Sequence, residues 1–283
     1  MRFSNARSKT ILSLIVVAAA GVVVASLLLT GDSAPRKSVA EQVTDGPPGA
    51  LTFILSDGSR RTVLARNPAE EVPASEPPIS AAPASSNTYP SPDGRYRALV
   101  RFDQQGMWLD VEARDAVVAT FPLAGIVGDQ IALGDGKVGA AAVAGVPLAV
   151  AWSPDSMRLA FGSVTGAPWT LNLVSVEDWR ASVHSVRGGY VGELAWAPDG
   201  SFLGVSTYEV GRTDHTVLIL DPGEQTARFL IDGCAITWSP DGEYLAVHRE
   251  PRVEPGVWIL SVSGDLLVRA SSDPDAFPLA WTN

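Results

Sequence analysis

Three histidines and one cysteine are the side chains of this sequence best suited to act as bases, nucleophiles or metal ligands. His184, His215 and His248 are widely separated, and the single cysteine, Cys234, excludes an intrachain disulfide. The sequence has no GxSxG, HExxH, P-loop or CxxC motif that would assign these residues to catalysis or metal binding. We expect hydrogen-bonded histidines, a buried thiol, no metal and no cofactor. The alternative is a metal or catalytic site assembled from distant loops.

Charged residues gather in two stretches that each follow an apolar run. The candidates for binding are Glu209, Arg212, Asp214 and His215 in the first stretch, and Arg249 and Glu250 in the second. Loops between strands lie on the surface and commonly carry binding residues on a rigid scaffold. The sequence therefore predicts that these side chains form part of a binding surface.

Four aspartates recur in one short motif, and we assign them to turns rather than to catalysis. The motif is Trp-Ser-Pro-Asp-Gly at 238–242, with variants that begin at 90, 152 and 196. Proline fixes φ, aspartate accepts bonds from nearby backbone amides, and glycine takes a positive φ. The expected turn residues are Pro92, Asp93, Gly94, Pro154, Asp155, Pro198, Asp199, Gly200, Pro240, Asp241 and Gly242.

The motif repeats at a period that is typical of stacked β-blades. Trp152, Trp196, Trp238 and Trp281 are 44, 42 and 43 residues apart. An apolar run follows each complete motif, and a polar turn joins a second strand pair farther on, so each repeat predicts four strands. A small residue recurs in the apolar run, at Ala98, Ala160, Gly204 and Ala246, and predicts close packing against a neighbouring strand or sheet. Arg97 stands where the other copies have leucine.

These motifs resemble the TolB-type, WD-repeat-like β-propeller family, whose repeats carry a similar WSPDG string before an LAF-like strand. The resemblance covers about residues 88–283. It implies an all-β propeller of about five four-stranded blades, with six as the alternative. The family includes periplasmic scaffolds, sensor or binding domains and the propeller caps of some peptidases, so the resemblance implies no single activity.

The two ends of the repeat region are expected to share one blade. Residues 51–65 resemble the outer strand pair of a blade without its start, and Leu279-Ala280-Trp281 resembles a blade start without its continuation. Sharing would close the ring and protect the edges of the sheets. Two stretches interrupt the repeats. Residues 67–88 are rich in Pro, Ala and Ser and predict a flexible excursion, and residues 124–147 predict a hairpin or a degenerate sixth blade.

A membrane anchor is expected before the propeller. Ile11 to Leu29 is a run of 19 residues without charge, which as a helix would extend about 28 Å, close to the hydrocarbon thickness of a bilayer. Arg2, Arg7 and Lys9 precede it, which favours a cytoplasmic N-terminus over residues 1–10. Residues 30–50 then form a tether to the propeller at 51–283, with the repeats at 89–283. The alternative is a cleaved signal peptide and a secreted protein.

The charge balance excludes some partners. The chain has 21 basic and 31 acidic residues, a net charge of −10, which argues against nucleic-acid binding. We therefore expect a membrane-anchored, extracytoplasmic β-propeller that acts as a protein-binding or scaffold module, with another envelope or membrane protein as its partner. The alternatives are a propeller hydrolase with a site in the central channel, or a small-ligand sensor domain.

Overall fold

The computed structural model describes residues 47–72, 87–127, 130–133, 136–139, 149–163, 170–185, 190–208, 215–224, 226–249, 254–263 and 265–282. All regular elements in these ranges are β-strands, which confirms the all-β class. The expected membrane span at 11–29 and most of the tether lie outside the described residues. Within the described ranges, no helix is long and apolar enough to cross a bilayer.

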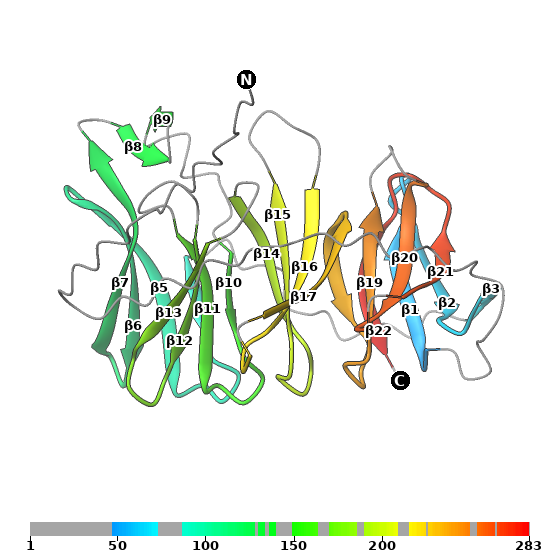
Figure 1. The fold of residues 1–283 in the computed structure, drawn as a ribbon, viewed down its shortest axis with the longest axis horizontal. Helices are drawn as coiled ribbons and strands as arrows, with labels where there is room; N and C mark the ends of the chain where they lie inside the picture. Colours follow the sequence, from blue (N-terminus) through cyan, green and yellow to red (C-terminus); the bar gives the residue numbers. More distant parts are fainter. Residues whose placement is uncertain are drawn as a thin grey trace, which may run out of the picture.

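The strands form five antiparallel sheets, which confirms the prediction of five blades (Figure 1). Blade 1 contains β4 (Thr88–Pro90), β5 (Tyr96–Asp103), β6 (Gly106–Ala113) and β7 (Ala116–Val127). Blade 2 contains β10 (Val150–Trp152), β11 (Arg158–Ser163), β12 (Thr170–Ser175) and β13 (Ala181–Ser185). Blade 3 contains β14 (Tyr190–Trp196), β15 (Leu203–Tyr208), β16 (His215–Asp221) and β17 (Thr226–Asp232). Blade 4 contains β18 (Cys234–Trp238), β19 (Tyr244–Arg249), β20 (Gly256–Ser261) and β21 (Leu266–Ser271).

Blade 5 is built from both ends of the repeat region, in the order β22, β1, β2, β3. Its strands are β22 (Phe277–Thr282), β1 (Ala50–Ile54), β2 (Arg60–Leu64) and β3 (Asn67–Glu71). Because β22 supplies the inner strand, 51–65 forms the second and third strands, not the outer pair. The outer strand is β3, so the expectation of a flexible excursion is wrong for 67–71.

The insertion after blade 1 forms a hairpin rather than a sixth blade. Strands β8 (Gln130–Leu133) and β9 (Gly136–Gly139) pair with each other, and β8 continues the sheet from the end of β7. Blades 1 and 2 meet directly, since Leu109 of β6 and Phe161 of β11 share one buried cluster. The sixth blade is therefore excluded for the described part of this insertion.

The turn motif makes the same contacts at one end of blades 1 to 4. The carboxylates of Asp93, Asp155, Asp199 and Asp241 each accept the backbone N–H two residues later, at 2.9 to 3.0 Å. The backbone N–H of Arg95, together with other donors, lowers the pKa of Asp93 to about 2. Ser156 takes the glycine position at φ 61°, and its hydroxyl accepts the Asp93 N–H at 3.1 Å. This bond offsets part of the cost of the left-handed backbone.

Tryptophans connect the inner strands of blades 2, 3 and 4 to the preceding inner strand, whereas Trp281 of blade 5 donates to the carbonyl of Pro48 at 2.8 Å. The indole N–H groups of Trp152, Trp196 and Trp238 donate to the carbonyls of Tyr89, Ala151 and Ala195, at 2.8 to 3.1 Å. The recurring small residues permit this close approach: a Cβ added to Gly204 would lie 3.0 Å from the side chain of Ile236 in blade 4. Packing between blades thus accounts for both repeated features.

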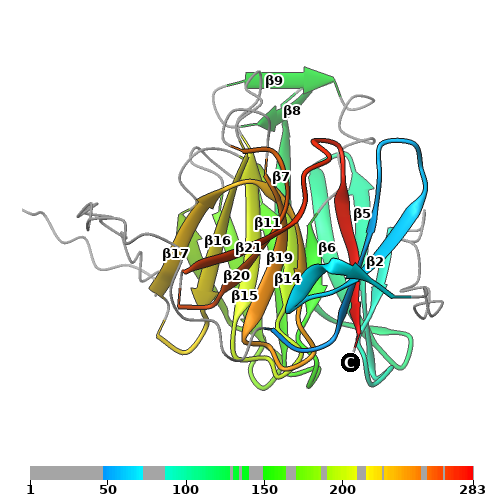
Figure 2. The ribbon, with the colours of Figure 1, turned by 90° about the vertical axis from the view of Figure 1, so that its right-hand side faces the viewer.

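The array of blades is open, which differs from the expected closed ring. Four buried apolar clusters join blade 1 to 2, 2 to 3, 3 to 4 and 4 to 5, and among the described residues no such cluster joins blade 5 to blade 1. The two end blades lie at opposite sides of Figure 1, and the view in Figure 2 shows them on the same side of the curved array.

The outward face of blade 1 explains why the array ends there. Leu159, Leu203 and Leu245 are buried in the contact with the preceding blade, whereas blade 1 has Arg97 at this position. Arg97 pairs with Glu112 at 2.6 Å, and Arg101 pairs with Asp110 at 2.7 Å. Paired charges of this kind suit a solvated terminal face, as in the capping units of repeat proteins.

Candidate functional site

Two residues predicted from the sequence lie on strand ends beside the same blade contact. His215 begins β16 in blade 3, and Arg249 ends β19 in blade 4. Glu209, Arg212, Asp214 and Glu250 lie outside the described residues. The strand ends at Tyr208, His215 and Arg249 lie at the end of the blades opposite the turn motif, which we call the loop end.

Strand alternation turns both residues toward the seam between blades 3 and 4. Val217 and Ile219 of β16 pack into the cluster between these blades, and His215 shares their alternation. Leu245 and Val247 of β19 pack into the same cluster, and Arg249 points to the same side of its strand as they do. We call the loop-end part of this contact the 3/4 seam.

The backbone between the two blades connects these strand ends tightly. Gly233 is the single residue between β17 and β18, and its N–H donates to the carbonyl of His215 at 2.9 Å. A Cβ on Gly233 would lie 2.4 Å from the carbonyl oxygen of His248, so no side chain fits there. Glycine therefore fixes the distance between the strand ends that carry His215 and Arg249.

Blade 3 adds aromatic rings and a buried carboxyl to the 3/4 seam. Tyr208 stacks on Tyr190 with ring centroids 5.3 Å apart, and it meets His215 edge-on at 5.7 Å. Glu193 accepts the backbone N–H of Ile236, in the inner strand of blade 4, at 3.1 Å. Burial raises the pKa of Glu193, and burial also raises the pKa of Tyr208.

Blade 4 contributes a tryptophan between two guanidinium groups. Arg249 and Arg269 lie over the ring of Trp258, with each Cζ 5.5 and 5.8 Å from the ring centroid. The indole N–H of Trp258 donates to the carbonyl of Glu254 at 2.8 Å, and Arg269 donates to the carbonyl of Pro255. These bonds hold Trp258 and Arg269 at the loop end, with both arginine cations over one ring.

The remaining histidines do not join this seam. His248 is buried on the opposite face of β19, where Nδ1 contacts the carbonyl of Ala276 at 2.9 Å and the ring stacks on Phe277 at 4.3 Å. His184 lies in the outer strand of blade 2, and burial lowers its pKa. Cys234 is half-buried rather than fully buried. Within the described ranges, no group of three or more His, Cys, Asp or Glu side chains could hold a metal ion.

Sequence reasoning missed four residues of the 3/4 seam: Glu193, Tyr208, Trp258 and Arg269. Trp258 resembles a core residue in the sequence, because a tryptophan recurs in the second strand pair of the repeats. It does pack partly against the cluster between blades 3 and 4. Its second surface, toward the arginines, depends on the strand register that pairs Trp258 with Arg269. The adjacency of Tyr208 to the charged stretch at 209 was the one local signal available.

Comparisons with known proteins give structural neighbours of low similarity. No family model and no curated protein matches the chain. TolB from Acinetobacter baumannii is 13% identical, covering 82% of this chain and 67% of that chain, with a TM-score of 0.42. The β-propeller domain of the Trilobed protease from Pyrococcus furiosus is 14% identical, covering 64% and 55%, with a TM-score of 0.43. A chain of the Mitotic Checkpoint Complex is 15% identical, covering 86% and 75%, with a TM-score of 0.44. The assignment of blades therefore depends on the strand order of this chain.

Proposed function

We propose that this chain is a membrane-anchored, extracytoplasmic protein-binding module, and that the loop end of the 3/4 seam binds its partner. The observation that carries the proposal is the stack of Arg249, Trp258 and Arg269 beside Tyr208 and His215. Tryptophan, tyrosine and arginine are the residue types most enriched among those that dominate protein–protein binding energy.

The rigidity of the supporting strands favours binding at this surface. Tyr208, Arg249 and Trp258 lie in paired strands, and Arg249 is 9% exposed. Side chains held in this way lose little conformational entropy on binding. Glu209, Arg212, Asp214 and Glu250 are close in sequence to Tyr208, His215 and Arg249, and we propose that they add polar contacts to the partner.

The proposed location follows from the N-terminal sequence. The uncharged run at 11–29, preceded by Arg2, Arg7 and Lys9, would hold the propeller outside the cytoplasm on a tether of about 20 residues. A partner in the envelope or membrane would then be within reach of the loop end. Protease digestion of cells whose outer envelope is permeabilised and whose cytoplasmic membrane is intact tests this arrangement, because a cytoplasmic propeller would be protected and a periplasmic or extracellular one would not.

A capture experiment with matched variants tests the binding surface. The full chain, purified from membranes, is used to capture partners from native membranes, with Arg269→Ala and Trp258→Phe as test variants. Arg101→Ala and Trp108→Phe are the controls, because Arg101 lies over the Trp108 ring at 5.9 Å on the outward face of blade 1. We expect capture to fall by about tenfold or more in the test variants alone, a change of about 1.4 kcal/mol. Equal capture by all four variants would overturn the proposal.

A further inference from the structure

At the turn-motif end, the seams between blades 1 and 2, 2 and 3, and 3 and 4 each place a planar side chain over the next blade's tryptophan. Tyr96 stacks on Trp152 with ring centroids 6.0 Å apart and an interplanar angle of 16°. Phe202 stacks on Trp238 at 6.5 Å and 10°. The equivalent residue between blades 2 and 3 is Arg158, whose Cζ lies 5.3 Å from the centroid of the Trp196 ring. An arginine thus replaces an aromatic ring at one position of an otherwise aromatic series.

The replacement keeps the stack and adds hydrogen-bond donors. A guanidinium group packs face-on like an aromatic ring, but it also carries five N–H donors and a permanent charge. Among the described residues, no carboxylate forms an ion pair with Arg158. The Arg158 guanidinium thus lies over the Trp196 ring with its N–H groups outside any ion pair of the described ranges, and Asp155 interacts with it electrostatically.

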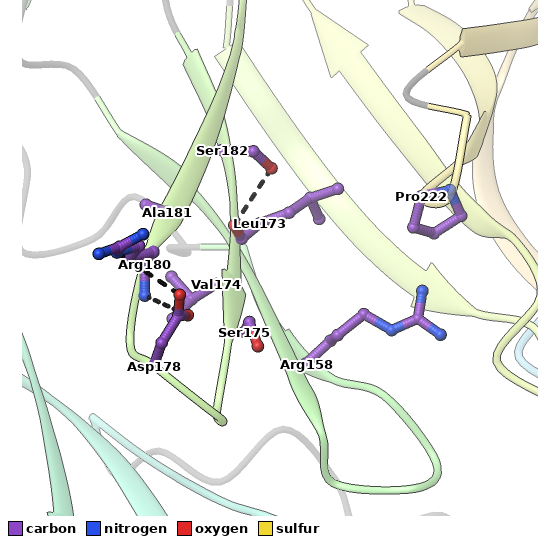
Figure 3. A pocket seen from close by; sticks show the side chains of 9 residues that line it. All are labelled: Arg158, Leu173, Val174, Ser175, Asp178, Arg180, Ala181, Ser182 and Pro222. Carbon is purple, nitrogen blue, oxygen red and sulfur yellow. Dashed lines mark hydrogen bonds and ion pairs between the residues drawn. The ribbon is translucent and has the colours of Figure 1, made fainter. Parts of the chain in front are cut away.

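A pocket opens beside Arg158 in the seam between blades 2 and 3. Figure 3 shows Arg158 extending across it toward Pro222 of blade 3, with Ser175, Ser182 and Arg180 on the blade 2 side. Arg180 is 87% exposed and lies 3.5 Å from Asp178, and the Ser182 hydroxyl donates to the carbonyl of Leu173 at 3.3 Å. The pocket therefore has both polar and apolar walls and is open to solvent on one side.

The sequence of the turns explains why a pocket forms at this seam. Between blades 1 and 2, Trp179 from the β12–β13 turn meets Tyr96 edge-on at 5.3 Å and fills the equivalent space. The corresponding β16–β17 turn of blade 3 has Pro222 and Gly223 instead of a tryptophan. The smaller turn leaves room beside Arg158.

We propose that this pocket binds an oxyanion, a carboxylate or phosphate group of a small molecule, with Arg158 as the main donor. The planar fork of arginine matches the two oxygens of such a group, whereas the charge of Arg180 is paired with Asp178, which also lines the pocket. The site is at the turn-motif end, opposite the loop end of the 3/4 seam. It is independent of the proposed partner surface, so either proposal can fail without the other.

The test titrates the full chain, in detergent micelles, with inorganic phosphate and separately with acetate. The arginine Nε–Hε resonances are followed by NMR. We expect saturable shifts in the millimolar range, about 10 mM or below, with at least one of the two anions. Arg158→Tyr restores the residue type of the other seams, so it should keep the melting temperature and lose saturable binding. Arg158→Lys should bind about tenfold more weakly, because an ammonium group cannot form the bidentate contact.

Arg60→Ala, which removes an exposed arginine of blade 5, is the matched control and should bind like the unaltered chain. Binding of phosphate alone would identify a phosphate site, and binding of acetate alone a carboxylate site. The proposal is overturned if neither anion gives saturable shifts, or if Arg158→Tyr binds as tightly as the unaltered chain.

Discussion

Deleting residues 277–283 should destabilise the whole domain, because β22 is the inner strand of the shared blade. The deletion removes Trp281, which is 8% exposed and packs with Leu51 and Phe53, and it leaves β1 without its inner neighbour. Loss of a buried tryptophan alone costs about 3–5 kcal/mol. Domains are stable by about 5–15 kcal/mol in total, so this is a large fraction. For a domain of this size, the cost corresponds to a fall of about 6–20 °C in melting temperature.

Thermal unfolding of the full chain, followed by near-ultraviolet circular dichroism, measures this effect. The matched control is Leu279→Ala in the same strand, because Leu279 is 40% exposed and its loss should change stability by no more than about 0.5 kcal/mol. A melting temperature that stays within about 2 °C after the deletion would refute the claim that β22 completes blade 5.

Three further changes test other parts of the structure. Gly204→Val should lower the free energy of unfolding, measured in urea, by about 1–3 kcal/mol, because a Cβ added there would lie 3.0 Å from the side chain of Ile236. An unchanged free energy would contradict the close packing of blades 3 and 4. Glu193→Gln should remove a pH dependence of the free energy of unfolding, because burial raises the folded pKa of Glu193 above the ordinary 4.5. The unaltered chain should therefore lose stability relative to the variant as pH rises from about 4.5 through the raised pKa. Parallel curves of unfolding free energy against pH would show that Glu193 is not buried. Ser156→Gly should change the free energy of unfolding by less than about 1 kcal/mol, because two effects oppose each other. Glycine relieves the strain of the positive φ, but the variant loses the hydrogen bond from the Asp93 N–H. A larger loss of stability would indicate that the hydroxyl contact dominates.

The repeat explains why so much of the fold follows from the sequence. Proline, aspartate and glycine in the turns have local backbone roles, and the tryptophan period sets the size of a blade, so four-stranded units can be predicted without tertiary information. The third and fourth strands of blade 5 lack the motif, so 67–71 resembles a proline-containing loop. It pairs with β2 in a local hairpin through residues 65 and 66, but Pro68, Glu70 and Glu71 are residue types that are depleted in strands.

Closure of the array could not be predicted, because it depends on the faces of the end blades. Arg97 differs from the leucines at the equivalent positions, and this single difference was visible in the sequence. Its consequence appears only with the register of β5 and β6, which places Glu112 opposite Arg97 and allows the charges to pair. Blade 1 then has a polar outward face instead of an apolar one.

The candidate site shows the same division between local and tertiary information. His215 and Arg249 could be found from sequence as charged or polar residues after apolar runs. Trp258 and Arg269 could not, because one resembles a core residue and the other an ordinary exposed charge. They become a binding candidate through cross-strand pairing, which brings both guanidinium groups over one ring. Arg158 is comparable, since its departure from the aromatic series is visible only when the seams are compared.

Crosslinking on intact cells tests the proposed function most directly. Cells that express the full chain, Arg269→Ala or the control Arg101→Ala are treated with a membrane-impermeant crosslinker, and captured proteins are identified by mass spectrometry. We predict one envelope or membrane protein that is captured by the unaltered chain and by Arg101→Ala, and about tenfold less by Arg269→Ala. Equal capture by Arg269→Ala and the unaltered chain would contradict the proposal.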